Sequence, residues 1–168
     1  MIYLGALFLF LASILQSVVL PQVVPISFMP HLVVLLVVAV CLVESLYDAI
    51  MWAFLGGLLL DLMSGPVLPI GSNALILVLV ALLASLGQAN PFHNRIFVPL
   101  VTVFVATMFY FVITMALAIA LGNHVAFVDN VFRVAVPSAV LNTVLMPAAY
   151  SLMLWLSMKL GRRVLIEW

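Results

Sequence analysis

The chain has 168 residues, of which 68% are hydrophobic and only 6% are charged. A soluble domain carries about 25% charged residues, so this chain cannot cover itself with polar surface. Five Lys and Arg balance five Asp and Glu, and this net charge of zero excludes the basic surface that nucleic acid requires. The apolar runs are continuous, which favours membrane helices over the alternating strands of a β-barrel.

The breaks between the apolar runs predict six membrane helices. Prolines, glycines and charged residues divide the chain into runs close to the length of roughly 20 residues that crosses a bilayer. We therefore expect an all-α integral membrane protein with a single transmembrane domain over residues 1–168. The second and third helices are separated only by the segment ESLYD, so a hairpin or a five-span arrangement is the alternative. The six helices are expected near 2–20, 29–45, 48–63, 71–88, 96–121 and 134–159.

Basic residues predict which end of the bundle faces the cytoplasm, because Lys and Arg are retained on that side. Lys159, Arg162 and Arg163 hold the C-terminus inside, and six spans then put the N-terminus and the Arg95 loop inside as well. Arg133 is the one basic residue left outside. The longest connection, GNHVAFVDNVFR, is too short for a folded domain, so we expect the protein to act within the bilayer or through partners.

The third predicted helix carries an acid, Asp61, on a stripe of small residues. Such stripes let helices approach closely in lipid, so Asp61 is expected to face protein rather than acyl chains. A negative charge near a helix C-terminus opposes the macrodipole, so a partner is expected. The candidate partners are Asn73, the backbone N–H groups of the 64–72 turn, and Arg133. The stripe consists of Ala49, Ala53, Gly57, Asp61 and Gly65.

Three roles are open for Asp61. It can pin the turn that follows its helix, contact another protein, or take part in ligand or proton chemistry. The turn, SGPVLPIGSN, has Gly65 and Gly71 for backbone freedom and two prolines that fix φ. The residues expected to form this turn or a partner contact are Gly57, Asp61, Gly65, Gly71 and Asn73.

Polar and helix-bending residues also mark the last predicted helix. Asn142, beside Thr143, can hydrogen-bond across a helix interface, and a ligand-binding role is the alternative. Pro147 should bend the helix, because proline removes one hydrogen bond and clashes with the preceding turn. We expect Ala49, Ala53, Asn142, Thr143 and Pro147 to serve helix packing.

Motifs for catalysis and for cofactor binding are missing from the sequence. Zinc-ligand spacing, a P-loop, a nucleophile elbow and H-E-x-x-H are all absent. An intramembrane protease would need a Ser–His pair or two aspartates in the membrane, and Asp61 is the only deep acid. We therefore expect no enzyme, no cofactor and no metal site. The histidines fall in three separate connections, as His31, His93 and His124.

Three segments stand out together: PHLVVLLVV at 30–38, GGLLLDLMSGP at 56–66 and GSNAL at 71–75. In a chain of this length with a basic C-terminal end, they resemble the MreD family, the rod shape-determining membrane proteins of bacteria. The detailed resemblance covers residues 30–88. The family usually begins the first segment with Pro-Asp-Leu, whereas His31 stands in the acidic position here. The most specific match is carried by Gly57, Asp61, Gly65, Gly71 and Asn73.

The resemblance implies a non-enzymatic adaptor of the bacterial inner membrane, surrounded by membrane lipids, that serves cell elongation. Such a protein would bind MreC, which has one membrane helix, and help couple MreB filaments to lateral peptidoglycan synthesis. RodA and a class B penicillin-binding protein would belong to the same complex. The implied fold is a six-helix bundle similar to the substrate-binding subunits of energy-coupling-factor transporters. The alternative is a substrate-binding subunit of a vitamin-type transporter, with Asp61, Asn73 and Asn142 lining a polar cavity open to the outside.

Overall fold

The computed structural model of the chain describes residues 2–23, 25, 29–63, 68–88, 97–123 and 126–159. All regular structure in these ranges is helical, and it forms six continuous helices, as the sequence predicts. The first comprises α1 (Ile2–Ile14), a π turn (Leu15–Val19) and α2 (Leu20–Val23). The middle four are α3 (Leu32–Val43), α4 (Leu46–Met63), α5 (Ser72–Gln88) and α6 (Phe97–Ala120). The last comprises α7 (Phe127–Asn130), a π turn (Val131–Ala135) and α8 (Val136–Lys159).

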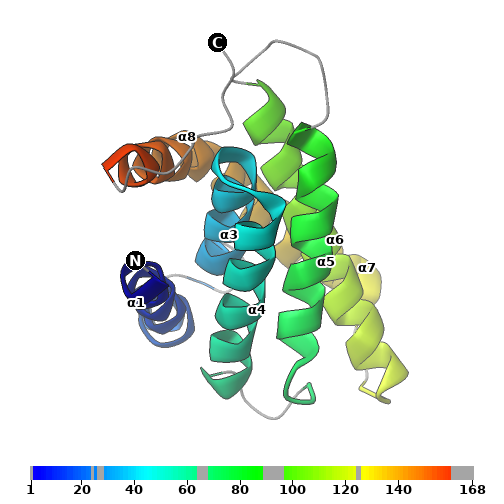
Figure 1. Cartoon of the computed structure of the whole chain (residues 1–168). Helices are drawn as coiled ribbons and strands as arrows, with labels where there is room; N and C mark the ends of the chain where they lie inside the picture. Colours follow the sequence, from blue (N-terminus) through cyan, green and yellow to red (C-terminus); the bar gives the residue numbers. More distant parts are fainter. Residues whose placement is uncertain are drawn as a thin grey trace.

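Helix α3 is the centre of the bundle. It contacts α1, α4, α5, α6 and α8, and Figure 1 shows it enclosed among them. Every residue of α3 is buried except Leu32 and Leu42, which are partly buried. A helix that is apolar all round is one that is buried all round. Its 12 residues extend over about 18 Å, well short of the roughly 30 Å hydrocarbon core of a bilayer.

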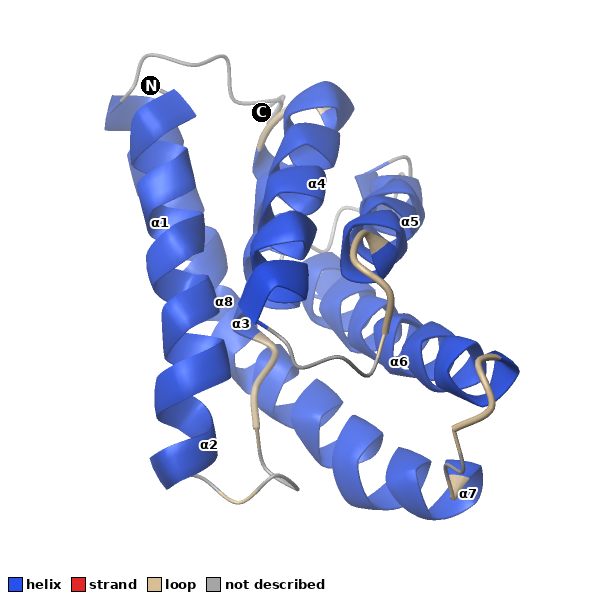
Figure 2. Ribbon diagram, turned by 90° about the horizontal axis from the view of Figure 1, so that it is seen from below, coloured by secondary structure: helices blue, strands red, loops and turns tan. Residues whose placement is uncertain are grey.

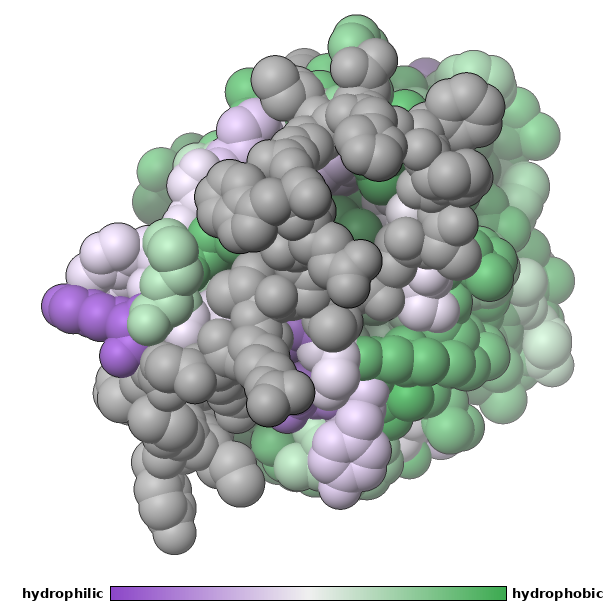
Figure 3. Space-filling model, turned by 45° about the horizontal axis from the view of Figure 1, so that its top comes forward, coloured by the Kyte–Doolittle hydropathy of each residue, from purple (hydrophilic) through white to green (hydrophobic). Residues whose placement is uncertain are grey.

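Three of the helices are long and apolar enough to cross a membrane: Leu46–Met63, Phe97–Ala120 and Phe127–Lys159. The segments Phe8–Val23, Leu32–Val43 and Ser72–Gly87 are apolar but shorter. The six-helix prediction is confirmed, and three candidate membrane spans are found in the described residues. Large apolar side chains cover the outside, and Figure 3 shows hydrophobic residues over much of one face.

A π turn precedes a proline at two places. The N–H of Leu20 donates to the carbonyl of Leu15, directly before Pro21, and the N–H of Val136 donates to Val131, directly before Pro137. Proline lacks an N–H and its ring clashes with the carbonyl four residues earlier, and a wider turn relieves that clash. The last helix can therefore begin at Phe127 rather than near residue 134.

Glycines bring α4 close to two of the helices that it contacts, α5 and α3, which Figure 2 shows from below. A Cβ atom at Gly57 would lie only 2.3 Å from the Cα and 2.5 Å from the N of Ala74 in α5. A Cβ atom at Gly56 would lie 2.8 Å from Cγ1 of Val33 in α3. The backbones of α4 and α5 are therefore in direct contact, as small residues permit in lipid.

We expect Gly57→Ala to destabilise the protein more than Gly56→Ala. The new methyl group at Gly57 meets backbone atoms of Ala74, which can move only if α4 and α5 separate, whereas at Gly56 it meets a side chain. Losses in the free energy of unfolding of about 3 and about 1 kcal/mol are expected. Unfolding in mixed micelles, followed by tryptophan fluorescence, measures both. Equal losses would contradict the close backbone contact.

Candidate functional site

Asp61 joins the end of α4 to the start of α5. Its Oδ2 accepts hydrogen bonds from the backbone N–H of Gly71 at 2.9 Å and of Ala74 at 3.3 Å. Its Oδ1 accepts from the backbone N–H of Asn73 at 3.1 Å and from the side-chain Nδ2 of Asn73 at 2.9 Å. The first N–H groups of a helix lack partners within the helix, and a negative charge there is favourable. The acid is unfavourable for its own helix but stabilises the next one.

The other residues predicted near Asp61 are Gly71, Gly65 and Arg133. Gly71 has a φ of +98°, a conformation that favours glycine, and in it the residue donates its N–H to the carboxylate. Gly65 lies outside the described residues. Arg133 lies in the π turn before α8 and is not a partner of Asp61 in the described part of the chain. The four donors from the start of α5 leave no lone pair of the carboxylate for an arginine.

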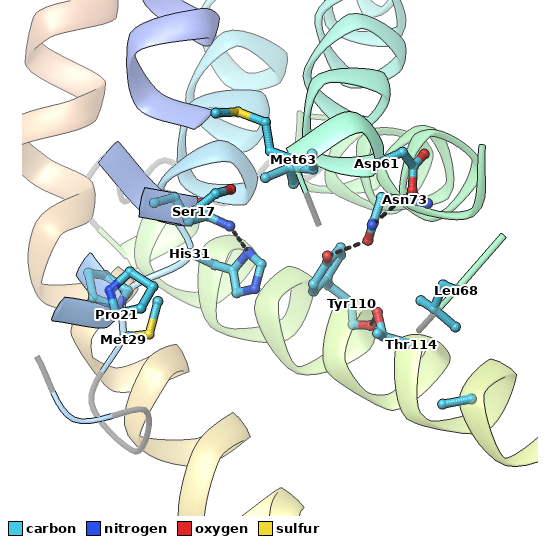
Figure 4. A pocket seen from close by; sticks show the side chains of 14 residues that line it. Ser17, Pro21, Met29, His31, Asp61, Met63, Leu68, Asn73, Tyr110 and Thr114 are labelled. Atoms are coloured by element: carbon cyan, nitrogen blue, oxygen red, sulfur yellow. Dashed lines mark hydrogen bonds between the residues drawn. The ribbon is translucent and has the colours of Figure 1, made fainter. Parts of the chain in front are cut away.

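Asn73 continues the polar contacts to α6. Its Oδ1 accepts a hydrogen bond of 2.6 Å from the hydroxyl of Tyr110 (Figure 4). The ring of Tyr110 lies against His31, with 4.6 Å between the ring centroids, and His31 meets Phe111 edge-on at 5.1 Å. Contacts from one side chain to the next thus connect α4, α5, α6 and the residue that precedes α3.

Gln16 fixes the protonation of His31. The side-chain Oε1 of Gln16 accepts from the N–H of Val33 at 3.0 Å, so its Nε2 is the atom that faces Nδ1 of His31, at 2.9 Å. An amide nitrogen can only donate, so Nδ1 accepts and the imidazole is neutral, with its proton on Nε2. The same glutamine also supplies an acceptor to the first turn of α3.

Asn142 joins α8 to both α3 and α6. Its Oδ1 accepts from the N–H of His31 at 3.0 Å, and its Nδ2 donates to the carbonyl of His31 at 3.3 Å and to Oγ1 of Thr107 at 3.0 Å. The Asn142 side chain is fully buried. Thr143 instead donates to the carbonyl of Ala139 in its own helix, at 2.7 Å. Pro147 lies inside α8, and the bend expected there stays a prediction.

A cavity of about 480 Å³ adjoins the polar contacts (Figure 4). Asp61 and Asn73 line it, as the transporter alternative expects, but Asn142 is not among its lining residues. Its polar wall comprises Gln16, Ser17, His31, Asp61, Asn73, Tyr110 and Thr114, and its apolar wall includes Met29, Leu60, Met63, Leu68 and Ala118.

A second hollow, of about 430 Å³, is a groove between α1 and α8 with α3 as its floor. Every side chain that lines it is apolar, and three of these residues are alanines: Ala12, Ala148 and Ala149. The remaining lining residues are Phe8, Leu11, Leu15, Leu32, Leu35, Leu36, Leu145 and Leu152.

Comparison with known families decides the identity of the chain. The family model described as rod shape-determining protein MreD matches residues 1–160. The chain belongs to the MreD family. Membership of the MreD family implies a role in determining rod shape. No curated protein and no solved structure matches the chain, so the expected likeness to energy-coupling-factor subunits stays a prediction.

Two of the segments that carry the MreD resemblance meet in space. The GGLLLDL part of the second segment brings Gly57 against Ala74 and Asp61 against Asn73, so it packs on the GSNAL segment at the start of α5. Ala49 and Ala53, earlier on the same stripe, are fully buried. The MreD pattern thus includes the closest contact between α4 and α5.

Sequence reasoning missed the contributions of Gln16, His31 and Tyr110. Their partners are 15, 37 or 111 positions away along the chain, and no local pattern indicates such pairs. His93 and His124 lie outside the described residues. Among the described residues, no group of three side chains is placed to hold a metal ion.

We expect Asp61→Asn to destabilise the protein strongly, and Asp129→Asn, at an exposed acid on α7, to have little effect. Asparagine has the same size as aspartate, but an NH₂ group replaces one of the two carboxylate oxygens. That group cannot accept the hydrogen bonds that the backbone N–H groups at the start of α5 donate. Losses in the free energy of unfolding of about 2 to 4 kcal/mol and at most about 0.5 kcal/mol are expected. Thermal unfolding in detergent measures both. A stable Asp61→Asn variant would show that the acid does not hold the turn.

Proposed function

We propose that the protein is a non-enzymatic adaptor of the bacterial cell-elongation complex, and that it binds the single membrane helix of MreC. The match to the MreD family over residues 1–160 carries this proposal. In the proposed complex, the adaptor helps couple MreB filaments to lateral peptidoglycan synthesis. RodA and a class B penicillin-binding protein are its further expected neighbours in the inner membrane.

The use of the polar groups supports an adaptor rather than an enzyme. Asp61 and Asn142 bind the starts of α5 and α3, and Asn73 binds Asp61 and Tyr110, so these side chains hold helices together. A catalytic group needs a free atom within reach of a substrate. The surface left for a partner is the apolar outside of the bundle, which suits recognition between membrane helices.

The groove between α1 and α8 is the surface that we assign to MreC. Every side chain that lines it is apolar, so the groove suits an apolar membrane helix rather than a polar peptide segment. Ala12, Ala148 and Ala149 leave room between the leucines, and such small residues allow close approach of helices in lipid. A helix laid there would cover two exposed leucines, Leu11 of α1 and Leu15 of the π turn that follows it.

The distribution of basic residues gives the proposed orientation. Lys159 is the last residue of α8 and marks the C-terminal end of that helix. With that end in the cytoplasm, both termini and the Arg95 loop face MreB, and Arg133 faces outward. The cavity beside Asp61 then opens toward the outer side of the membrane.

The cavity favours one second candidate, a substrate-binding subunit of a small-molecule transporter. Its volume of about 480 Å³ is within the range of sites for small molecules. Such a subunit would retain its small molecule through purification, whereas an adaptor would retain a membrane protein. Of the three residues named for that alternative, Asn142 contacts the backbone of His31 and the side chain of Thr107 instead.

We expect Ala148→Trp to abolish capture of MreC, because the indole fills the groove. The matched control is Ala116→Trp, at an exposed alanine of α6 outside the groove. Each variant is produced together with MreC and purified in mild detergent, and the molar ratio of MreC to the protein is measured.

A ratio near one for the wild type and the control, with at least a tenfold lower ratio for Ala148→Trp, supports the proposal. Equal ratios for the two variants would remove the groove from it. If MreC co-purifies with none of the three proteins and a small molecule co-purifies instead, the result favours the transporter subunit.

A further inference from the structure

The cavity beside Asp61 has unused hydrogen-bonding capacity on its polar wall. His31 is neutral with its proton on Nε2, and no described residue accepts a hydrogen bond from that atom. The hydroxyl of Tyr110 donates to Asn73 and that of Thr114 donates to the carbonyl of Tyr110, at 2.7 Å. Each hydroxyl oxygen therefore keeps a lone pair with which it can accept. The cavity thus offers a guest the Nε2–H donor of His31 and the hydroxyl acceptors of Tyr110 and Thr114, together with the hydroxyl of Ser17, which also lines it.

The charge of the wall selects against anions. Asp61 is an acid, and no Lys or Arg is among the lining residues. A phosphate group would therefore meet repulsion without a compensating cation. An ammonium group is not favoured either, because the four lone pairs of the Asp61 carboxylate already accept hydrogen bonds from α5. An uncharged guest that both donates and accepts fits best.

The apolar lining residues suit a hydrocarbon chain. Leu60, Met63 and Leu68 are apolar, and methionine adapts its shape to irregular guests. Leu62 and Ile70, which lie close to lining residues in the sequence, are 66% and 75% exposed, so the surface near the cavity is also apolar. A guest with its polar end in the cavity can therefore extend its chains into the bilayer.

We propose that this cavity binds the head of an uncharged, hydroxyl-bearing membrane lipid of the diacylglycerol class. A diacylglycerol has one hydroxyl and two ester carbonyls. The hydroxyl donates to the oxygen of Tyr110 or Thr114, and an ester carbonyl accepts from Nε2 of His31. This inference goes beyond the adaptor function and uses a different surface, because none of the residues that line the cavity also lines the proposed MreC groove.

The test uses the full chain in phosphatidylcholine nanodiscs with three probes. The first is dioleoylglycerol, the second is dioleoylphosphatidic acid, which carries a phosphate in place of the free hydroxyl, and the third is free glycerol, which lacks the chains. Native mass spectrometry of the released protein counts the bound probe. We expect dioleoylglycerol to bind at least tenfold more tightly than either of the others. Equal binding of the phosphatidic acid would overturn the charge argument, and equal binding of glycerol would overturn the assignment to a lipid.

Variants locate the bound probe. Ala118→Phe and Leu68→Trp each fill the cavity, and whichever of them folds should lose dioleoylglycerol at least tenfold. His31→Phe keeps a ring beside Tyr110 but removes the donor, and we expect about tenfold weaker binding. Ala116→Phe, on the outside of α6, should bind as the wild type does.

If a folded cavity-filling variant binds dioleoylglycerol as tightly as the wild-type protein does, the proposal is overturned. All of these variants should still capture MreC, so a failure of the lipid site and a failure of the adaptor function are separate results.

Discussion

A backbone N–H group that lies away from water needs a hydrogen-bond acceptor within the protein. The structure depends on how the first N–H groups of two helices, α3 and α5, obtain their acceptors. The first turn of α3 receives its acceptors from Gln16 and Asn142, and the first turn of α5 receives them from Asp61. In each case the acceptor belongs to another helix. Satisfying one helix start therefore also fixes the position of a second helix.

The same contacts lie between the polar cavity beside Asp61 and the apolar groove between α1 and α8. Contacts from Asp61 through Asn73 and Tyr110 reach His31, and Asn142 holds the backbone of the same histidine. His31 lines the polar cavity, while its neighbour Leu32 lines the apolar groove. The start of α3 thus separates a polar site from an apolar one.

Much of this structure could be predicted from the sequence, because lipid imposes a simple rule on helices. The apolar runs indicate six helices, and the small residues around Gly57 indicate a close contact. The unfavourable position of Asp61 indicates a partner, and Asn73 and the turn backbone were among the candidates. Arg133 was a wrong candidate, because local backbone donors reach the carboxylate first.

The remaining contacts could not be predicted, because they join residues that are far apart in the sequence. Nothing near Asn142 in the sequence indicates that it contacts His31, 111 residues earlier. The π turns do have a local cause in Pro21 and Pro137, but proline more often ends a helix than widens it. The early start of the last helix therefore could not be read from composition.

The short length of α3 has a consequence for biogenesis. A segment of 12 residues is too short to be recognised by itself as a bilayer-crossing stretch during synthesis. It is followed almost at once by α4, so we expect the two to enter the membrane together as a hairpin. The backbone N–H of His31 then lacks its acceptor until Asn142, more than a hundred residues later, has emerged from the ribosome. Assembly of this bundle is therefore completed from its C-terminal end.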